Sequence, residues 1–216
     1  MDFLPQPISE YSSKYTDLPS ELLKELDRET CAKVLAPRML AGHYQGRLLS
    51  MLSHMIRPKR VLEIGTYTGY SALCLAEGLH PEGLIYTIDK NEELESIVKR
   101  YHEKSPYRNS IHQVIGIALD EIPNLKEPWD IVFIDADKEN YLNYYHLVFD
   151  QMPVGGYVIA DNVLWSGKVL DEEEKASDID TKALHEFNTF VQADSRVENI
   201  LLAIRDGLMI VRKIKD

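Results

Sequence analysis

The chain has 216 residues, a hydrophobic content of 44% and a formal net charge of −11 at pH 7. This length permits a substantial buried core, in one large domain or two small ones, and the composition is that of a globular chain and not of a disordered one. The acidic balance argues against nucleic-acid backbones and anionic membranes as default partners, although a local basic patch could override it.

The N-terminal sequence has neither the basic nor the apolar region of a secretory signal, and no apolar segment approaches the length of a membrane span. We therefore expect a cytoplasmic protein without membrane contact. The two cysteines, Cys31 and Cys74, fit a reducing compartment and have no metal-ligand spacing. Both fall on predicted helices, and we expect both to pack in the core.

Residues before about Pro19 show no hydrophobic period and are expected to form an arm. Ser20 can cap a helix that runs to about Leu35, and a second helix is predicted from Gly42 to Ile56. The apolar sides of these helices are expected to hold Leu22, Leu23, Leu26 and Val34 in the first, and Leu48, Leu52, Met55 and Ile56 in the second. Within residues 1–57 they would form a cap over a ligand-binding edge, or a subunit contact.

The stretch Arg60–Ala76 predicts a strand, a glycine turn and a helix, the usual place for a nucleotide-like ligand in an open α/β sheet. Gly65 and Gly69 would let a ligand approach the backbone. The turn lacks the Lys-Ser/Thr of a P-loop and the third glycine of a dinucleotide fingerprint. It therefore offers threonine hydroxyls and the Glu63 carboxylate to a ligand; a turn without any ligand is the alternative.

Strands and helices alternate regularly after this turn. Further strands are expected over 83–89, 111–115, 129–135 and 156–160, and helices over 91–104, 141–151 and around Leu184, Phe187 and Val191. The charged stretch 167–180 reads as a solvated loop. Two apolar runs, 199–204 and 208–212, flank Arg205-Asp206-Gly207, and Asp-Gly is a strong hairpin signal. The fold class is therefore α/β: one domain with a doubly wound, mostly parallel sheet, closed by one antiparallel strand.

Four of the predicted strands end in acids, namely Glu63, Asp89, Asp135 and Asp161. In a parallel sheet such ends share the edge where ligands bind, although any one acid could instead cap a helix or a turn. Glu63 and Asp89 flank the glycine turn, where an acid commonly binds ribose hydroxyls, and Ala118 could pack on an adenine-like ring. Asp135, Asp161 and Asn162 would supply hard oxygen ligands that suit Mg²⁺ and not zinc.

These residues resemble a known family. The segments EIGTYTGYS, TID, FIDADKENY and ADNVLWSG are similar to motifs of the cation-dependent class I O-methyltransferases, which include the caffeoyl-CoA and catechol enzymes, and the resemblance covers about Gly42 to the C-terminus. It implies a Rossmann-like fold for residues 58–216, S-adenosylmethionine as cofactor, a divalent cation such as Mg²⁺, Ca²⁺ or Mn²⁺, and a homodimer. The implied cofactor contacts are Ala41, Glu63, Gly65, Thr66, Ser71, Asp89, Ala118 and Asp137. The implied cation ligands are Asp135, Asp161 and Asn162.

The resemblance also makes Lys138 the catalytic lysine, beside Asp135, and places Tyr144 and Trp165 on the substrate side. A cation that chelates two adjacent hydroxyls would lower the pKa of a phenol, ~10 when free, and orient its oxygen for methyl transfer. Lys138 would then take the proton or stabilise the oxyanion. We therefore expect methyl transfer to a catechol-type small molecule. The alternatives are a methyltransferase for a hydroxylated base of transfer RNA, a nicotinamide-dependent oxidoreductase and a binding protein without turnover.

Overall fold

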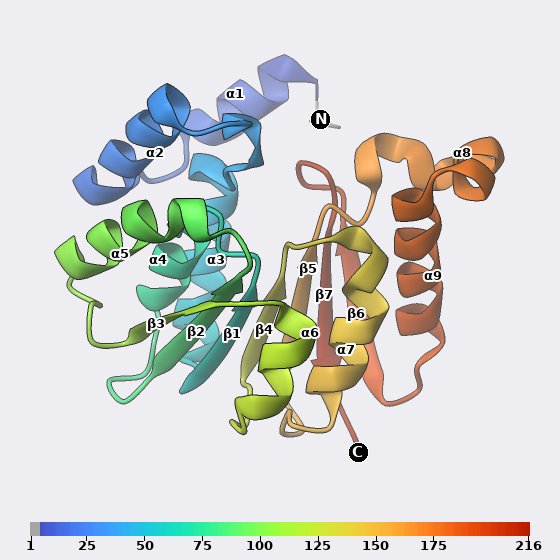
Figure 1. Cartoon of the computed structure of the whole chain (residues 1–216). Helices are drawn as coiled ribbons and strands as arrows, with labels where there is room; N and C mark the ends of the chain where they lie inside the picture. Colours follow the sequence, from blue (N-terminus) through green and yellow to red (C-terminus); the bar gives the residue numbers. More distant parts are fainter. Residues whose placement is uncertain (1–4) are drawn as a thin grey trace. The chain divides into compact units, whose positions relative to one another are not determined.

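The structure, a computed structural model, describes residues 5–216. Its strands pair in a seven-stranded mixed sheet, and Figure 1 labels the helices and strands along the chain. The chain divides into two compact units, one of which spans Pro7–Ile117 while the other includes Ala118–Asp216. We call them the N-terminal unit and the C-terminal unit and describe each by itself.

Three parallel strands form the sheet of the N-terminal unit: β1 (Arg60–Ile64), β2 (Leu84–Asp89) and β3 (Ile111–Ile115), in the order β3-β2-β1. The interior of β1 is buried throughout, as a strand covered on both faces should be. The register places Glu63 beside Thr87 and Asp89 beside Ile115. The last residues of the three strands therefore lie at one edge, where the glycine turn begins.

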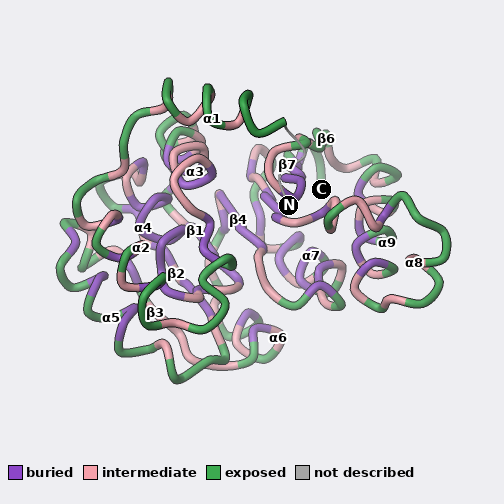
Figure 2. The backbone as a smooth tube through the Cα atoms, turned by 90° about the horizontal axis from the view of Figure 1, so that it is seen from above, coloured by how far each residue is buried: buried purple, intermediate pink, exposed green. Residues whose placement is uncertain are grey.

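The helices of this unit largely follow the predicted boundaries. They are α1 (Gln6–Lys14), α2 (Glu21–Lys33), α3 (Gly42–Ile56), α4 (Tyr70–Ala76) and α5 (Glu95–Lys104), with 3₁₀ turns η1 (Pro37–Met39) and η2 (Glu92–Leu94). Ser20 caps α2 by accepting a hydrogen bond from the backbone N–H of Leu23, as expected. Figure 2 shows α1 mostly exposed, with a few residues of intermediate exposure. The arm expected before Pro19 contains a helix over Gln6–Lys14, which has no buried residue, and residues 1–4 of that arm lie outside the described residues.

The buried face of α3 differs from the predicted one. Its buried residues are Gln45, Gly46, Leu49, Ser50 and Ser53. Met55, expected in the core, is 75% exposed. The reason is a close approach to α4: a Cβ on Gly46 would lie 2.7 Å from Tyr70 Cε1, and Ser53 Oγ donates to the carbonyl of Leu75 at 2.6 Å. Small side chains permit this contact, so Leu49 is the only large apolar residue of α3 that is buried, and Met55 lies on the exposed side. Cys74 is buried as expected, but Cys31 is exposed.

The C-terminal unit contains the other four strands: β4 (Ile131–Ile134), β5 (Tyr157–Asp161), β6 (Val197–Leu202) and β7 (Leu208–Lys213), in the order β4-β5-β7-β6. β4 and β5 are parallel, and β7 is antiparallel to both β5 and β6. The predicted fold class is therefore confirmed: a doubly wound, mostly parallel sheet with one antiparallel strand from a C-terminal hairpin. That the whole chain acts as one domain stays a prediction.

The helices of the C-terminal unit are α6 (Ala118–Glu121), α7 (Tyr141–Phe149), α8 (Glu172–Ser177) and α9 (Ile179–Ala193), with 3₁₀ segments η3 (Ile122–Asn124), η4 (Lys138–Asn140) and η5 (Trp165–Leu170). α9 buries the three expected residues, Leu184, Phe187 and Val191. The ring of Phe187 contacts Tyr141 and Tyr145 of α7 edge-on, at centroid distances of 5.7 and 6.3 Å. This aromatic packing fixes α7, and with it the segment that follows β4.

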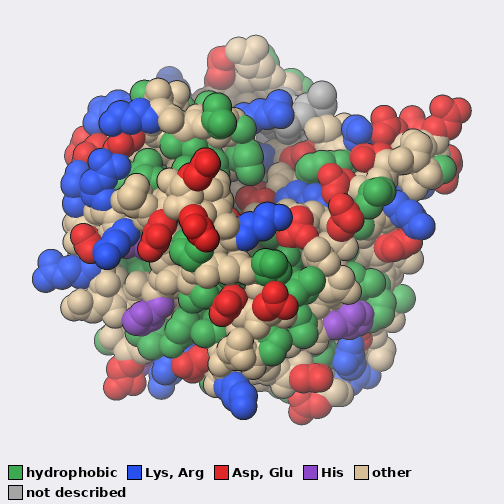
Figure 3. Space-filling model, viewed as in Figure 1, with side chains coloured by type: hydrophobic (Ala, Val, Ile, Leu, Met, Phe, Trp, Pro, Cys, Tyr) green, Lys and Arg blue, Asp and Glu red, His purple; other side chains and the backbone are tan. Residues whose placement is uncertain are grey.

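The acidic stretch 167–180 is not a loop throughout. Asp171 accepts hydrogen bonds from the backbone N–H groups of Glu173 and Glu174 and so caps α8. Three glutamates in the first turn also suit the positive end of the helix dipole. The charge run therefore forms a capped helix whose acidic side chains stand out on the surface (Figure 3). No helix within residues 5–216 is long and apolar enough to cross a membrane.

Candidate active site

The glycine turn of the N-terminal unit follows β1 and has a left-handed backbone at three positions: Gly65, Tyr67 and Gly69, with φ of 101°, 48° and 86°. Gly69 also approaches α5 closely, because a Cβ there would lie 2.7 Å from Nε2 of His102. A side chain at Gly69 would therefore meet both backbone strain and a steric clash. His102 is buried, and this burial lowers the pKa of its imidazole to about 4.

Asp89, at the end of β2, holds this turn in place. Its Oδ2 accepts a hydrogen bond from the backbone N–H of Tyr67 at 2.8 Å, and its Oδ1 accepts one from the N–H of Asn91 at 2.9 Å. Its backbone carbonyl accepts from the N–H of Gly116, directly after β3, at 3.0 Å. Since a carboxylate can accept about four hydrogen bonds, the partly exposed Asp89 retains capacity for a ligand diol.

Glu63 lies at the end of β1 and is completely buried. The hydroxyl of Thr87 donates to its Oε2, and Thr87 in turn pairs with the hydroxyl of Thr66. The hydroxyl of Thr68 pairs with that of Thr30 at 3.2 Å. The threonine hydroxyls of the turn therefore make hydrogen bonds inside the protein. The sequence had suggested instead that they would be available to a ligand. The reason is that the turn is covered on its inner side by β2 and α2.

The other expected cofactor residues divide between the two units. Ala41 lies just before α3 and Ser71 in the first turn of α4, both largely buried, in the unit that also holds Glu63, Gly65, Thr66 and Asp89. Ala118 and Asp137 belong to the C-terminal unit, Ala118 at the start of α6 and Asp137 just before η4.

A polar cluster in the C-terminal unit centres on Lys138. Its Nζ donates to Oδ1 of Asp135 at 3.1 Å, to Oδ1 of Asn162 at 3.1 Å and to the hydroxyl of Tyr141 at 2.7 Å. Lys138 is 8% exposed, so its ammonium group is stabilised largely by these three partners. The residues after β4 and the residue after β5 are thereby brought together around one positive charge.

Tyr141 completes this cluster, although it had no expected role. Its hydroxyl accepts from Lys138 and donates to the backbone carbonyl of Asp161 at 3.0 Å. Burial raises the pKa of Tyr141 well above its usual value, and the carboxylates of Asp135 and Asp161 add to this shift. Tyr141 therefore stays a neutral donor that ties Lys138 to the end of β5. The sequence signal was present, since Tyr141 ends the FIDADKENY segment.

The expected cation ligands can be compared with this arrangement. Asp135 and Asn162 present oxygens to the same ammonium group, and Oδ1 of Asp161 accepts the N–H of Asn162 at 2.8 Å. Two carboxylates and one amide fit a hard divalent cation, and the ammonium shows that a positive charge is accommodated there. Within residues 5–216, no three His, Cys, Asp or Glu side chains gather to hold a metal, so the amide oxygen is essential to such a set.

The expected substrate-side residues lie in the same unit. The hydroxyl of Tyr144 donates to Oδ1 of Asp137 at 2.5 Å. Burial is the main cause that raises the pKa of Tyr144, and this hydrogen bond is the second. Lys138 Nζ lies 5.8 Å from the ring centroid of Trp165, within reach of a cation–π contact. An indole beside a buried ammonium group offers a flat apolar surface next to the polar cluster, a combination that suits an aromatic ring with hydroxyl groups.

Comparisons with known proteins show which family this chain is similar to. Residues 10–214 match the O-methyltransferase family. The chain is 35% identical over 204 residues to caffeoyl-CoA O-methyltransferase 5 of Nicotiana tabacum, which covers 90% of this chain and 85% of the relative. The O-methyltransferase from Bacillus cereus, solved in complex with SAH, aligns with a TM-score of 0.87 and 28% identity over 96% of this chain and 97% of that one. The SAH-bound methyltransferase PaMTH1 of Podospora anserina aligns with a TM-score of 0.89 and 25% identity over 100% of both chains.

These similarities extend over nearly the whole chain and include both units. They agree with the resemblance carried by the sequence motifs, and they argue against a nicotinamide-dependent oxidoreductase. The chain belongs to the O-methyltransferase family that contains the caffeoyl-CoA enzymes.

Proposed function

We propose that this O-methyltransferase transfers a methyl group from S-adenosylmethionine to one hydroxyl of a catechol-type small molecule, with the help of a divalent cation. The observation that carries the proposal is the pair of side-chain oxygens, from Asp135 and Asn162, that meet at the ammonium group of Lys138. We further propose that residues 1–216 act as one domain, in which the N-terminal unit binds most of the cofactor and the C-terminal unit performs the chemistry.

The cofactor assignment is supported by the glycine turn and by the SAH-bound relatives. Asp89 would bind the ribose hydroxyls, because its carboxylate stands at the end of β2 with capacity for further hydrogen bonds. Gly65, Thr66 and Ser71 would contact the cofactor mainly through the turn backbone. Ala41, which has no side-chain hydroxyl, would keep a backbone contact with the cofactor but make no side-chain hydrogen bond to it. Glu63 would act through its bond to Thr87, while Ala118 would pack on the adenine and Asp137 would bind a polar group.

For the cation, Asp135, Asp161 and Asn162 would be the ligands, and Mg²⁺, Ca²⁺ or Mn²⁺ would suit their oxygens. When bound, such an ion supplies Lewis acidity that lowers the pKa of a phenolic hydroxyl and favours a chelating pair of hydroxyls over a single one. The protein contributes the placement of the oxygens. The hydrogen bond from the N–H of Asn162 to Oδ1 of Asp161 and the bond from Tyr141 to the Asp161 carbonyl fix the last residue of β5 and the residue that follows it.

Lys138 would act on the hydroxyl that becomes methylated. Its three hydrogen bonds are those of a charged ammonium group, which is suited to stabilising an oxyanion. It could serve as a base only after giving up one of these protons. Tyr144 and Trp165 would hold the aromatic ring of the acceptor, and the Trp165 indole already lies beside the ammonium group.

We also propose that the protein is a cytoplasmic homodimer. The free cysteines Cys31 and Cys74 fit a reducing compartment. Met51 and Met55 of α3 are 60% and 75% exposed, which supports this face of α3 as the subunit contact.

An assay with S-adenosylmethionine, Mg²⁺ and a panel of catechols and monophenols tests the proposal. Methylation of catechols but not of monophenols, abolished by EDTA and restored by added Mg²⁺, is expected. Activity that EDTA leaves unchanged would remove the cation from the proposal. Methylation of total RNA, but of no catechol, would instead support the transfer-RNA alternative.

A further inference from the structure

The segment that follows Asp161, residues 162–167, has an unusual backbone. Asn162, Trp165, Ser166 and Gly167 all have left-handed φ values, of 61°, 46°, 56° and 84°. Glycine and asparagine adopt this conformation readily, whereas for other residues it costs roughly 1–2 kcal/mol each. Strain of this kind persists only where the surrounding contacts determine the conformation. We call this segment the 162–167 loop.

The determining contacts come from the hairpin turn between β6 and β7. The backbone carbonyl of Asp206 accepts the N–H of Leu164 at 2.9 Å, and that of Gly207 accepts the N–H of Val163 at 3.2 Å. The carboxylate of Asp206 accepts the N–H of Ser166 at 2.5 Å. The backbone N–H groups of three loop residues, Val163, Leu164 and Ser166, therefore donate hydrogen bonds to the turn residues Asp206 and Gly207.

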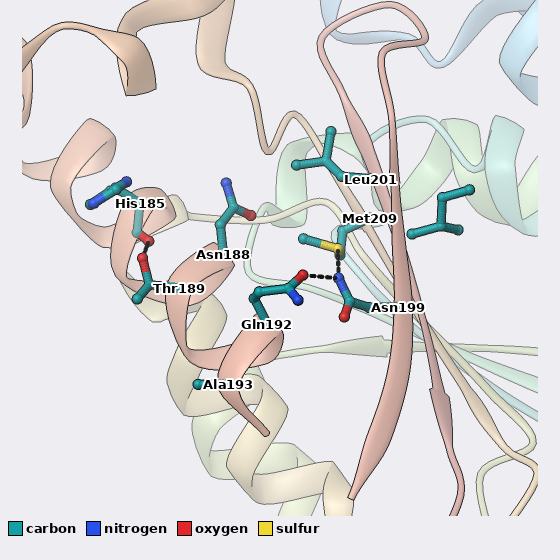
Figure 4. Close-up of a pocket in the computed structure, with 9 residues that line it drawn as sticks. His185, Asn188, Thr189, Gln192, Ala193, Asn199, Leu201 and Met209 are labelled. Atoms are coloured by element: carbon teal, nitrogen blue, oxygen red, sulfur yellow. Dashed lines mark hydrogen bonds between the residues drawn. The ribbon is translucent and has the colours of Figure 1, made fainter. Parts of the chain in front are cut away.

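The loop is also held by close packing. Gly207 has a φ of 91°, and a Cβ there would lie 2.6 Å from Cγ and 2.8 Å from the backbone N of Leu164. On another side, Nδ2 of Asn188 in α9 donates to the carbonyl of Val163 at 2.9 Å. Figure 4 shows Asn188 on α9, facing the pocket that this helix forms with the β6–β7 hairpin. The turn and α9 together leave the loop little freedom.

Asp206 is the unexpected member of this arrangement. An aspartate in a hairpin turn is ordinarily exposed, but Asp206 is only 9% exposed, and burial raises the pKa of its carboxyl group. Burying a carboxylate is unfavourable unless it makes compensating hydrogen bonds. The compensating partner is the N–H of Ser166, one of the strained residues, so the side chain serves the loop as well as its own turn.

The loop carries two residues that face Lys138. Asn162 places its Oδ1 3.1 Å from Lys138 Nζ, and the Trp165 ring centroid lies 5.8 Å from the same nitrogen. A displacement of the loop would therefore move a cation ligand and an acceptor-binding ring together. A misplacement of about 1 Å near reacting groups can cost a factor of a hundred in rate.

We propose that Asp206 is a positioning residue: by accepting the N–H of Ser166 it fixes the 162–167 loop, and thereby sets the Asn162 oxygen and the Trp165 ring beside Lys138. Its effect on turnover rests on the proposed function. The placement of Trp165, however, can be measured without any catalysis.

Fluorescence provides this measurement. The chain has two tryptophans. Trp129 is completely buried, and its Nε1 donates to Oε1 of Gln151. Trp165 is partly exposed, so quenching by acrylamide reports mainly on Trp165. The test compares this quenching, and kcat/KM for a catechol, in wild type, Asp206→Ala and Asp206→Asn. Asp171→Ala is the matched control, because Asp171 also accepts backbone N–H groups in the C-terminal unit but caps α8.

In Asp206→Ala, the fluorescence of Trp165 should fall more steeply with acrylamide concentration than in wild type. The same variant should lower kcat/KM by about tenfold to a hundredfold, with cofactor affinity unchanged. Asp206→Asn, whose amide oxygen can still accept from Ser166, should restore both values toward wild type, and Asp171→Ala should change neither. Wild-type quenching in Asp206→Ala, or equal losses in Asp206→Asn and Asp206→Ala, would overturn the proposal.

If Asp206→Ala does not fold, Gly207→Ala provides the second variant, because its Cβ would press against Leu164 while the carboxylate remains. Stronger quenching of Trp165 in Gly207→Ala would support the conclusion that the hairpin turn fixes the 162–167 loop, and unchanged quenching would contradict it. If the wild-type protein methylates no catechol, the proposed function fails, whereas the quenching comparison still decides the role of Asp206.

Discussion

The amide oxygen of Asn162 lies 3.1 Å from the ammonium nitrogen of Lys138, although the two residues are 24 positions apart in the chain. The contact joins the residue that follows β5 to the 3₁₀ turn that follows β4. Parallel pairing of the two strands brings their ends together, and the hydroxyl of Tyr141 bonds to both sides. These hydrogen bonds hold the two strand ends together, as a site that orients reacting groups requires.

Asp161→Ala should abolish methyl transfer while leaving the affinity for S-adenosylmethionine nearly intact. The change removes a proposed cation ligand and the acceptor for the N–H of Asn162, both in the C-terminal unit. Turnover assays and calorimetric titration of the cofactor measure the two effects separately. Asp150→Ala, which removes an exposed aspartate of the same unit, is the control and should behave as wild type. Equal loss of turnover and cofactor affinity in Asp161→Ala would mean that Asp161 belongs to the cofactor site and not to a separate cation site.

Asp89→Ala should have the opposite effect and weaken cofactor binding first. It removes the carboxylate proposed to bind the ribose hydroxyls, and a hydrogen bond to a charged group contributes about 1.5–3 kcal/mol, which corresponds to roughly tenfold or more in affinity. The turn also loses the acceptor for the N–H groups of Tyr67 and Asn91. Glu92→Gln removes one negative charge from an exposed neighbouring position and serves as the control in the same titration. If both variants bind the cofactor like wild type, Asp89 has no part in its site.

Tyr141→Phe should lower kcat by about tenfold or more without changing cofactor affinity, because Lys138 loses a hydrogen bond and its link to Asp161. Tyr145→Phe is a close control: Tyr145 lies on the same helix, is equally buried, and donates to Oδ2 of Asp194 at 3.0 Å, away from Lys138. Steady-state kinetics and thermal unfolding of both variants separate catalysis from stability. Similar kcat values in the two variants would contradict the positioning of Lys138 by Tyr141.

Stability should fall as the pH drops from about 6.5 to about 4, because His102 has its pKa lowered to about 4 by burial. In this window the unfolded chain binds a proton on this histidine and the folded chain does not, so the contribution is fully present above pH 6.5. A hydrogen bond with Tyr101 is the main cause that lowers the pKa of Glu29 to about 2, and one with Arg196 is the main cause that lowers the pKa of Asp194 to about 2. The stability that these two carboxylates contribute is lost as the pH falls toward 2.

The free energy of unfolding in urea, measured at several pH values, checks the role of His102. His102→Gln should flatten the dependence between pH 4 and 6.5, and wild type and variant should differ by a constant amount above pH 7. A slope in His102→Gln equal to that of wild type would show that another group is responsible.

A dimer built on α3 should dissociate when Met55 is replaced by Glu, because a charge would then be buried in the contact. Light scattering after gel filtration measures the mass. Ile200→Lys is the matched variant on a different surface, since Ile200 of β6 is also more than half exposed. Loss of the dimer in Ile200→Lys but not in Met55→Glu would place the contact on the β6 edge instead.

Much of the fold could be predicted because the strands and long helices carry clear periodic patterns. β3 and α3 have the predicted boundaries, and the Asp206-Gly207 signal correctly located the β6–β7 hairpin. The buried face of α3 could not be predicted from hydrophobicity, because its close approach to α4 selects Gly46 and Ser53 over larger apolar residues. The helix α8 was missed because its cap at Asp171 lies within an acidic run that resembles a solvated loop.

The candidate site was predicted through residue types at strand ends, and the expected residues Asp135, Lys138 and Asn162 do meet. Residues that act through hydrogen bonds to other groups gave no separate signal. The sequence marks Tyr141 only as the last residue of the FIDADKENY segment, and Asp206 only as part of the Asp-Gly hairpin signal. Their roles depend on contacts between segments that are 20 and 40 residues apart, which no local pattern specifies.

An oxygen-only cation site formed by Asp135, Asp161 and Asn162 is central to the proposed function. Titration of the protein with Mn²⁺, followed by the electron paramagnetic resonance signal of the free ion, measures this site without any acceptor. We predict that the wild-type chain binds Mn²⁺ at one site, that Asp161→Ala loses this site, and that Asp89→Ala keeps it. A wild-type chain that leaves the free-ion signal unchanged, or an Asp161→Ala variant that binds Mn²⁺ like wild type, would contradict the account.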